Sequence, residues 1–190
     1  MSTSAYNETL AHIKDREGFF PVGYFPTPLS GVTIGIGIDL GQQTKTSLTN
    51  LGISPTIISK CEKYFGLKSE AEVKAKHLNA SDLVLTRSEA EDLSKPFIMD
   101  SFNVAQPYRG QMNDKGLAVL VSLRHWAGSL GSTSGKLFVN SKNANLVWNV
   151  IKDKNATNSE LREALKQTLL DKKSGTAGYN RIKHEIAYLG

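Results

Sequence analysis

The sequence predicts an α+β protein with one small β-sheet near the N-terminus and a mostly helical remainder. Three observations lead to this class: a helical period in the first 18 residues, a stretch over 19–41 rich in Phe, Tyr, Val, Ile and Gly that is typical of a β-hairpin or small sheet, and repeated helix-start signals after it. Strands and helices segregated along the chain are typical of α+β folds. A chain of 190 residues can form one domain with a sizeable core. We therefore expect a single domain made of a first helix (1–18), a β-lobe (19–53) and a helical lobe (54–190).

The composition excludes several classes of protein. No apolar run approaches the roughly 20 residues that a membrane span needs, and Met1–Tyr6 has neither the basic nor the apolar region of a signal peptide. The single cysteine, Cys61, excludes a disulfide framework and any multi-cysteine zinc site. Its apolar neighbours at helical spacing predict a buried structural thiol. The net charge of +5 favours a polyanionic partner, but no block of like charges selects one.

The first helix is predicted from a stripe of apolar residues that ends on a carboxylate. Tyr6, Leu10 and Ile13 recur at helical steps, and the next step reaches Glu17, in the last turn before a capping Gly18. Burial and the negative end of the helix dipole both oppose ionisation of a carboxyl group at such a position. A carboxyl that stays protonated is what general acid catalysis requires. Glu17 is therefore a candidate acid, and the alternative is a glutamate at a frayed helix end that reaches water.

A second candidate cluster lies in the segment 31–41. Its alternation predicts one strand, with an apolar face and a polar face that carries two glycines. Glycines on one face of a strand indicate a close approach to the backbone, and a sugar ring suits such a floor. The alternative is a glycine-bent strand whose polar face is merely hydrated. The apolar face consists of Val32, Ile34, Ile36 and Ile38, and the opposite face of Thr33, Gly35, Gly37 and Asp39.

Helix-start signals are frequent after this strand. Ser54-Pro55 places a capping serine before a first-turn proline, and the spacing of a capping box recurs three times. The apolar segment 117–123 predicts a helix that is buried on most sides. The last helix is expected over about 177–189. The three capping boxes are Ser69-x-x-Glu72, Thr86-x-x-Glu89 and Thr157-x-x-Glu160.

In this order, the motifs resemble the start of phage-type lysozymes, which are α+β muramidases with a catalytic Glu, Asp and Thr. Glu17-Gly18 matches the acid of that family, and the segment 33–37 (Thr-Ile-Gly-Ile-Gly) matches its Thr-Ile-Gly-x-Gly strand. In the best-known phage enzymes the Asp comes six residues before the Thr, where this chain has Thr27. Asp39 comes six residues after it, and the order Glu, Thr, Asp is similar to the branch represented by pesticin, a bacterial toxin. Further similarities lie in 85–93, 117–131 and 178–185.

The resemblance implies a lysozyme-like fold and hydrolysis of the β-1,4 bond between N-acetylmuramic acid and N-acetylglucosamine in peptidoglycan. Glu17 would protonate the leaving oxygen, and Asp39 with Thr33 would position and activate a water molecule; no metal or cofactor is expected. Inverting, retaining and transglycosylase outcomes stay open. Arg181 is expected either to pair with Glu17, as a late Arg does in related enzymes, or to form a surface salt bridge. The expected substrate-binding residues are Tyr24, Gly35, Gly37 and Arg181.

The resemblance also implies a biological setting. The expected partner is a peptidoglycan glycan strand, the protein is expected to be a monomer, and a toxin would bring an immunity protein as a second partner. Without a visible signal peptide, a secretion system or a phage holin would deliver it to the cell wall, and the position of Asp39 favours a toxin or effector over a phage endolysin. The alternative is a non-catalytic lysozyme fold that binds the wall. A nucleic-acid partner is not expected, because no basic helix or aromatic-basic stripe occurs.

Overall fold

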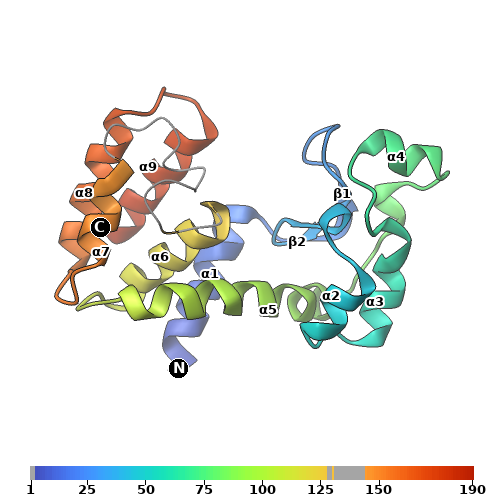
Figure 1. Ribbon diagram of the computed structural model, residues 1–190, viewed down its shortest axis with the longest axis horizontal. Coiled ribbons are helices and arrows are strands. Elements are labelled where there is room, and N and C mark those ends of the chain that lie inside the picture. Colours follow the sequence, from blue (N-terminus) through green and yellow to red (C-terminus); the bar gives the residue numbers. More distant parts are fainter. Residues whose placement is uncertain (1–2, 128–129, 131–143) are drawn as a thin grey trace. The chain divides into compact units, whose positions relative to one another are not determined.

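The computed structural model describes residues 3–127, 130 and 144–190 (Figure 1). Two compact units make up the chain. One, the sheet unit, is Glu17–Phe97; the other, the helical unit, combines Met1–Arg16 with Ile98–Gly190. The predicted α+β class is confirmed, since one small antiparallel sheet lies near the N-terminus and helices make up most of the described remainder.

The sheet has the strand order β1-β2-β3, with antiparallel neighbours. β1 is Phe20–Tyr24, β2 is Thr33–Gly35 and β3 is Ile38–Asp39. All four apolar positions of the predicted strand are buried, as expected from the alternation. These side chains are part of the core of the sheet unit.

The prediction of one continuous strand over 31–41 is wrong, because the chain reverses direction between β2 and β3. Ile34 pairs with Ile38, and Thr33 pairs with Asp39. The reversal depends on Gly35 and Gly37, whose φ angles of 67° and 92° lie in the left-handed region that glycine adopts without steric cost. The glycines therefore form a tight hairpin instead of lining one face of a strand.

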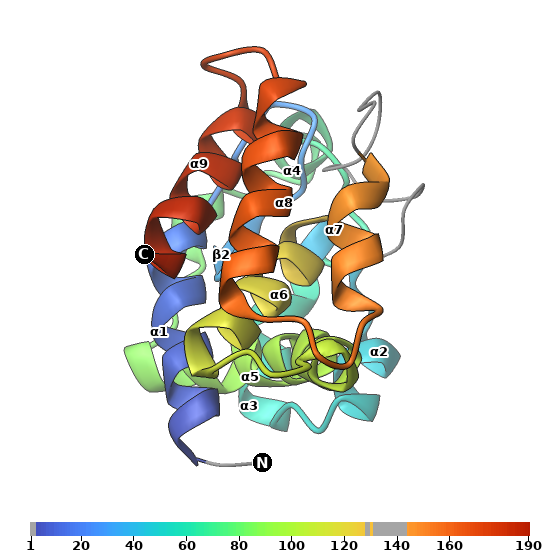
Figure 2. The same cartoon turned by 90° about the vertical axis from the view of Figure 1, so that its left-hand side faces the viewer.

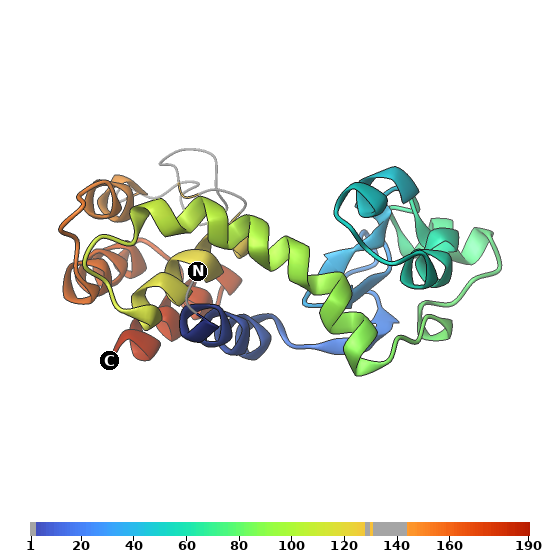
Figure 3. The ribbon, with the colours of Figure 1, turned by 90° about the horizontal axis from the view of Figure 1, so that it is seen from below.

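Short helices follow the sheet within the same unit, and Figure 3 shows them beside the strands. The predicted caps are present: the Ser54 hydroxyl accepts a hydrogen bond from the Ile57 amide, and the Ser69 hydroxyl accepts one from the Glu72 amide. The helices are α2 (Lys45–Asn50), α3 (Pro55–Cys61), α4 (Glu70–Ala75) and the first part of α5 (Arg87–Ala105), with 3₁₀ turns η1 (Leu40–Gln42), η2 (Glu62–Tyr64) and η3 (Ala80–Asp82).

The compact unit that holds the sheet extends to Phe97, whereas the sequence placed the start of a helical lobe at residue 54. Backbone pairing explains the difference. The chain after η3 returns to β1, where Val22 and Val84 form an antiparallel bridge. The Gly23 amide donates to the Leu83 carbonyl at 2.9 Å. The helices between residues 54 and 82 are thereby fastened to the sheet.

The helical unit contains α1 (Thr3–Glu17) and the later helices. Within it, α7, α8 and α9 lie side by side (Figure 2). Helix α6 is buried along 117–123, as predicted. The capping box at Thr157 and Glu160 is also present. The further elements are the end of α5, η4 (Gln106–Tyr108), α6 (Asp114–Ala127), α7 (Ala144–Ile151), α8 (Asn158–Leu170) and α9 (Ala177–Leu189).

The buried face of α1 differs from the predicted one. Ile13 is buried as expected, but Tyr6 and Leu10 are only partly buried. Thr9 and His12 are buried beside Ile13. A stripe of apolar residues does not indicate which polar residues are buried. The predicted buried face of α1 is therefore rotated about the helix axis from the observed one. The end of α1 is as predicted, because the next residue, Gly18, has a φ of 72°.

Candidate active site

Three of the predicted site residues form one row across the sheet. Tyr24 of β1 pairs with Thr33 of β2, and Thr33 pairs with Asp39 of β3. Directly opposed residues of antiparallel strands point to the same face, with Cβ atoms about 5 Å apart. In one continuous strand, six residues would separate Thr33 from Asp39 by about 20 Å. The hairpin therefore brings together two residues that the predicted strand would have kept apart.

The Asp39 carboxylate sits in a space that two glycines leave open. Its Oδ1 atom accepts a hydrogen bond of 2.8 Å from the Gly41 amide and so caps η1. A side chain at Gly31 would collide with Oδ1, and a Cβ atom at Gly41 would lie 3.0 Å from it. The side chain as a whole is half buried. One oxygen of Asp39 thus has a fixed structural partner, which orients the carboxylate.

The Thr33 hydroxyl lies at the centre of the row and is almost fully buried, with 2% of the residue exposed. It donates a long hydrogen bond of 3.3 Å to the Gly31 carbonyl. Since this bond is weak, the hydroxyl can rotate at little cost toward another acceptor. Thr33 is therefore suited to orient a small polar group beside Asp39.

Glu17 lies beside the tip of the β2–β3 hairpin. It is the last residue of α1 and is half buried. A Cβ atom added to Gly37 would lie 4.0 Å from Glu17 Oε2, with nothing closer. Gly37 is exposed, so the bare turn and the carboxylate of Glu17 adjoin one another at the surface of the sheet unit.

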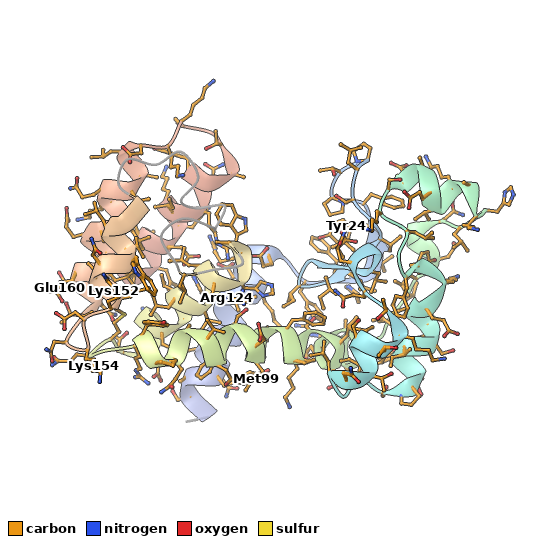
Figure 4. The ribbon with its side chains drawn as sticks, viewed as in Figure 1. Tyr24, Met99, Arg124, Lys152, Lys154 and Glu160 are labelled. Carbon is orange, nitrogen blue, oxygen red and sulfur yellow. The ribbon has the colours of Figure 1, made fainter. Side chains whose placement is uncertain are left out.

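Tyr24 lies on the sheet unit within electrostatic reach of Glu17 (Figure 4). Burial raises the pKa of the Tyr24 phenol, and the negative charge of Glu17 raises it further. The phenol therefore remains a hydrogen-bond donor at neutral pH. The ring of Phe20 packs against the ring of Tyr24, with centroids 4.8 Å apart.

The two glycines of the hairpin have different surroundings. A Cβ atom at Gly35 would lie 2.6 Å from Ser94 Oγ, and Ser94 belongs to α5. The close approach to Gly35 is thus made by a helix of the protein. Gly37 has no such neighbour, which leaves its backbone open on that side.

Arg181, in the helical unit, belongs to a buried polar cluster. Its guanidinium donates to the Ser122 carbonyl at 3.0 Å and to the Ser122 hydroxyl at 2.7 Å. Its Nε atom lies 3.0 Å from Glu185 Oε1. Glu185 is fully buried, accepts a hydrogen bond from the Ser122 hydroxyl at 2.6 Å and contacts His12 Nε2 at 2.6 Å. The alternative of a surface salt bridge at Arg181 is therefore wrong.

Sequence reasoning missed this cluster almost entirely. The spacing of Arg181 and Glu185, one helical turn apart, was the only available signal. His12 and Ser122 come from α1 and α6, far away in sequence, and nothing in their local pattern indicates that they meet Glu185. Such clusters depend on tertiary packing.

No helix in the described part of the chain is long and apolar enough to cross a membrane. Among the same residues, no group of three or more His, Cys, Asp or Glu side chains is placed to hold a metal ion.

One family model matches residues 9–154, and its description is "Pesticin: Bacterial toxin homologue of phage lysozyme, C-term". The chain belongs to this family. The match covers Glu17 and the whole β2–β3 hairpin, so the candidate site lies within it. Helices α8 and α9, with Arg181, lie beyond its end. No curated protein matches the chain.

Proposed function

We propose that the protein hydrolyses the β-1,4 bond between N-acetylmuramic acid and N-acetylglucosamine in peptidoglycan. One observation carries the proposal: the β2–β3 hairpin sets Asp39 opposite Thr33 and its tip lies against the Glu17 carboxylate. These three residues are of the types that the lysozyme resemblance implies. They lie in the segment that matches a family described as a homologue of phage lysozyme.

In the proposed reaction, Glu17 gives its proton to the oxygen of the leaving sugar as the bond from that oxygen to the anomeric carbon breaks. A water molecule attacks the anomeric carbon, and Asp39 accepts its proton while the Thr33 hydroxyl orients it. Glu17 ends as a carboxylate and Asp39 as a carboxylic acid, and exchange with solvent restores both. Carboxyl groups roughly 6.5–9.5 Å apart would leave room for this water and invert the anomer, whereas roughly 5–5.5 Å would indicate a retaining route.

The substrate-binding residues follow from their surroundings. The open backbone at Gly37 and the protonated phenol of Tyr24 both adjoin Glu17 and are proposed to bind the sugar. Gly35 faces Ser94, which favours a packing role for this glycine. Arg181 is held by Ser122 and by Glu185, which favours a structural role over direct contact with the glycan.

The family description also supports a biological role. Since the matched family is described as a bacterial toxin homologue, we favour an antibacterial toxin or effector that acts on the cell wall over a phage endolysin. The glycan strand of peptidoglycan is then its substrate, and an immunity protein is the second partner to be sought. Neither role changes the chemistry proposed for Glu17.

The test is clearing of purified peptidoglycan by the wild type and by Glu17→Gln, Asp39→Asn and Asp15→Asn. Asp15 is the matched control, because it is an exposed carboxylate two residues from Glu17 whose pKa is lowered by its hydrogen bond and ion pair with Arg16. We expect Glu17→Gln to lose about 10²–10⁴-fold in rate, as loss of a general acid does. Asp39→Asn should lose about 10²-fold or more, and Asp15→Asn should match the wild type.

Each outcome bears on a separate part of the proposal. An inactive wild type would refute hydrolysis and favour a wall-binding fold. Full activity of Asp39→Asn would remove Asp39 from the mechanism while leaving Glu17 in place. Product analysis completes the test, since a reducing end indicates hydrolysis and an anhydro end indicates transglycosylation.

A further inference from the structure

Phe20 stands apart among the aromatic residues of the described chain. It is 46% exposed, whereas every other described Phe, Tyr and Trp residue is at least partly buried. Phe20 opens β1, where it pairs with Gly35. Tyr24 is the one aromatic residue that the sequence analysis assigned to the substrate. Phe20 therefore presents an exposed aromatic surface beside the proposed site.

The Phe20 ring is held firmly despite this exposure. A Cβ atom at Gly18 would lie 2.5 Å from Phe20 Cε2 and 2.9 Å from Cζ, so the ring lies across Gly18, the residue that follows Glu17. On another side it meets the ring of Tyr24 at 4.8 Å with an interplanar angle of 56°. A ring fixed between two such contacts loses little conformational entropy when a ligand binds to its open part.

This arrangement suits one kind of ligand. The C–H groups on the face of a β-linked pyranose pack against an aromatic ring, while its hydroxyl groups need polar partners at the edge. Phe20 offers the apolar ring, and Tyr24 offers a protonated phenol next to it. Binding sites for small polar molecules commonly combine aromatic walls with a few placed polar groups. Glu17 lies just beyond, which puts this surface beside the proposed scissile bond.

We propose that Phe20 is a substrate-binding platform on which a pyranose ring of the glycan stacks next to the bond that Glu17 protonates. The inference rests on the proposed function for the identity of the ligand. A platform that binds ground state and transition state alike changes KM and leaves kcat unaltered. It also requires an aromatic ring, so an aliphatic side chain of similar size does not replace it.

The experiment measures kcat and KM on soluble, uncross-linked glycan strands for the wild type, Phe20→Leu, Phe20→Trp and Leu51→Ala. Leu51 is the matched control, because it is 40% exposed in the same unit and lies in no part of the proposed site. For Phe20→Leu we expect KM to rise on the order of tenfold, the scale of a lost aromatic contact, with kcat within about twofold. Phe20→Trp should keep the wild-type KM, and Leu51→Ala should change neither constant.

A binding measurement separates this inference from the proposed function. In a Glu17→Gln background, calorimetry with the same glycan strands should show a loss of affinity for Phe20→Leu that matches the rise in KM. If the wild type binds in this Phe20-dependent way but does not cleave, the proposed function fails and the platform stands. If the wild type cleaves and Phe20→Leu has unaltered KM and affinity, the platform is refuted.

Two other results would also overturn the platform. A fall in kcat at constant KM would mean that Phe20 supports the geometry of Glu17 and does not bind the sugar. The Phe20→Trp protein gives a reading that does not depend on the folding of Phe20→Leu. In the Glu17→Gln background, the fluorescence of the indole at position 20 should shift when glycan is added. The control is the same titration of Glu17→Gln without the Trp substitution, and an unchanged signal would contradict stacking.

Discussion

Glu185 in the helical unit and Asp39 in the sheet unit are both carboxylates with fixed hydrogen bonds, but their surroundings differ. Glu185 is fully buried and lies against Ser122, His12 and Arg181. Asp39 is half buried, and one of its carboxylate oxygens accepts one hydrogen bond from the Gly41 amide. A buried charge must be matched by neighbours, which stabilises one arrangement of helices. A half-buried carboxylate beside glycines can still meet a substrate, so the surroundings of Glu185 favour a structural role and those of Asp39 favour the chemical role that we propose for it.

The largest expected effect on stability is therefore at Glu185. Glu185→Gln removes the charge that Arg181 lies against and weakens the bonds from Ser122 and His12. Breaking a buried pair by removing one partner costs about 3–5 kcal/mol, and we expect a loss of this size in the free energy of unfolding measured with urea. The corresponding change at Asp39, Asp39→Asn, should lower activity with a much smaller loss of stability.

Glu163→Gln is the control for Glu185→Gln, because Glu163 is an exposed carboxylate of the same unit that pairs with Lys166. Exposed ion pairs contribute little, so its unfolding midpoint should equal that of the wild type. An unaltered midpoint for Glu185→Gln would show that the buried cluster does not hold the helices together. The contrast between the two regions would then have no energetic basis.

A second, smaller contrast lies within the hairpin itself. Gly35→Ala and Gly37→Ala both place a side chain on a left-handed residue, which costs about 1–2 kcal/mol. Gly35→Ala also forces its Cβ atom against Ser94 Oγ, so its unfolding free energy should fall further than that of Gly37→Ala. Gly37→Ala adds a methyl group near Glu17 Oε2 and should reduce glycan cleavage more than its modest loss of stability explains.

Thermal unfolding and initial rates of peptidoglycan clearing measure these two effects on the same samples. A lower stability of Gly37→Ala than of Gly35→Ala would contradict this contrast within the hairpin, since no side chain lies close to the Cβ position of Gly37. Equal activity of Gly37→Ala and wild type would mean that the open backbone at the hairpin tip is not part of the substrate site.

Local patterns in the sequence predicted the features that depend on neighbouring residues. The α+β class, the end of α1 at Gly18 and the burial of Ile34 and Ile38 follow from capping signals and alternation. The β2–β3 hairpin could not be predicted from these patterns. The same alternation of apolar and polar residues occurs whether a glycine continues a strand or reverses the chain. The pairing of Thr33 with Asp39 is a result of that reversal.

Long-range features were beyond local patterns for a different physical reason. His12 and Glu185 are 173 residues apart and meet only because α1 and α9 pack in the same unit. A polar residue on a predicted helix is ordinarily assigned to the surface. Thr9 and His12 are buried instead, so the buried face of α1 differs from the one predicted from apolar residues alone. The candidate residues Glu17, Thr33 and Asp39 could be selected from local patterns because they lie within one short stretch of chain, and their catalytic roles stay a prediction.

The last effect appears only at alkaline pH and concerns Cys61, a buried group that avoids charge by staying protonated. Burial raises the pKa of its thiol to about 11, and the charge of Glu89 adds to the increase. Between about pH 9 and pH 11 the unfolded thiol ionises while the folded one keeps its proton. The native state then binds more protons, so its stability is full below about pH 9 and falls with rising pH by up to about 1.4 kcal/mol per pH unit.

Other groups titrate in the same range, so the wild type must be compared with Cys61→Ala. The cavity left by the substitution costs a constant amount, and the advantage of the wild type over Cys61→Ala should shrink as the pH rises from about 8 to about 10.5. Urea unfolding at both pH values measures this difference.

A thiol reagent at about pH 8 should label the wild type only in urea, because the neutral, buried thiol is unreactive. Rapid labelling of the native protein would show that Cys61 is reached by solvent, and a pH-independent difference would mean that its charge is not excluded from the fold.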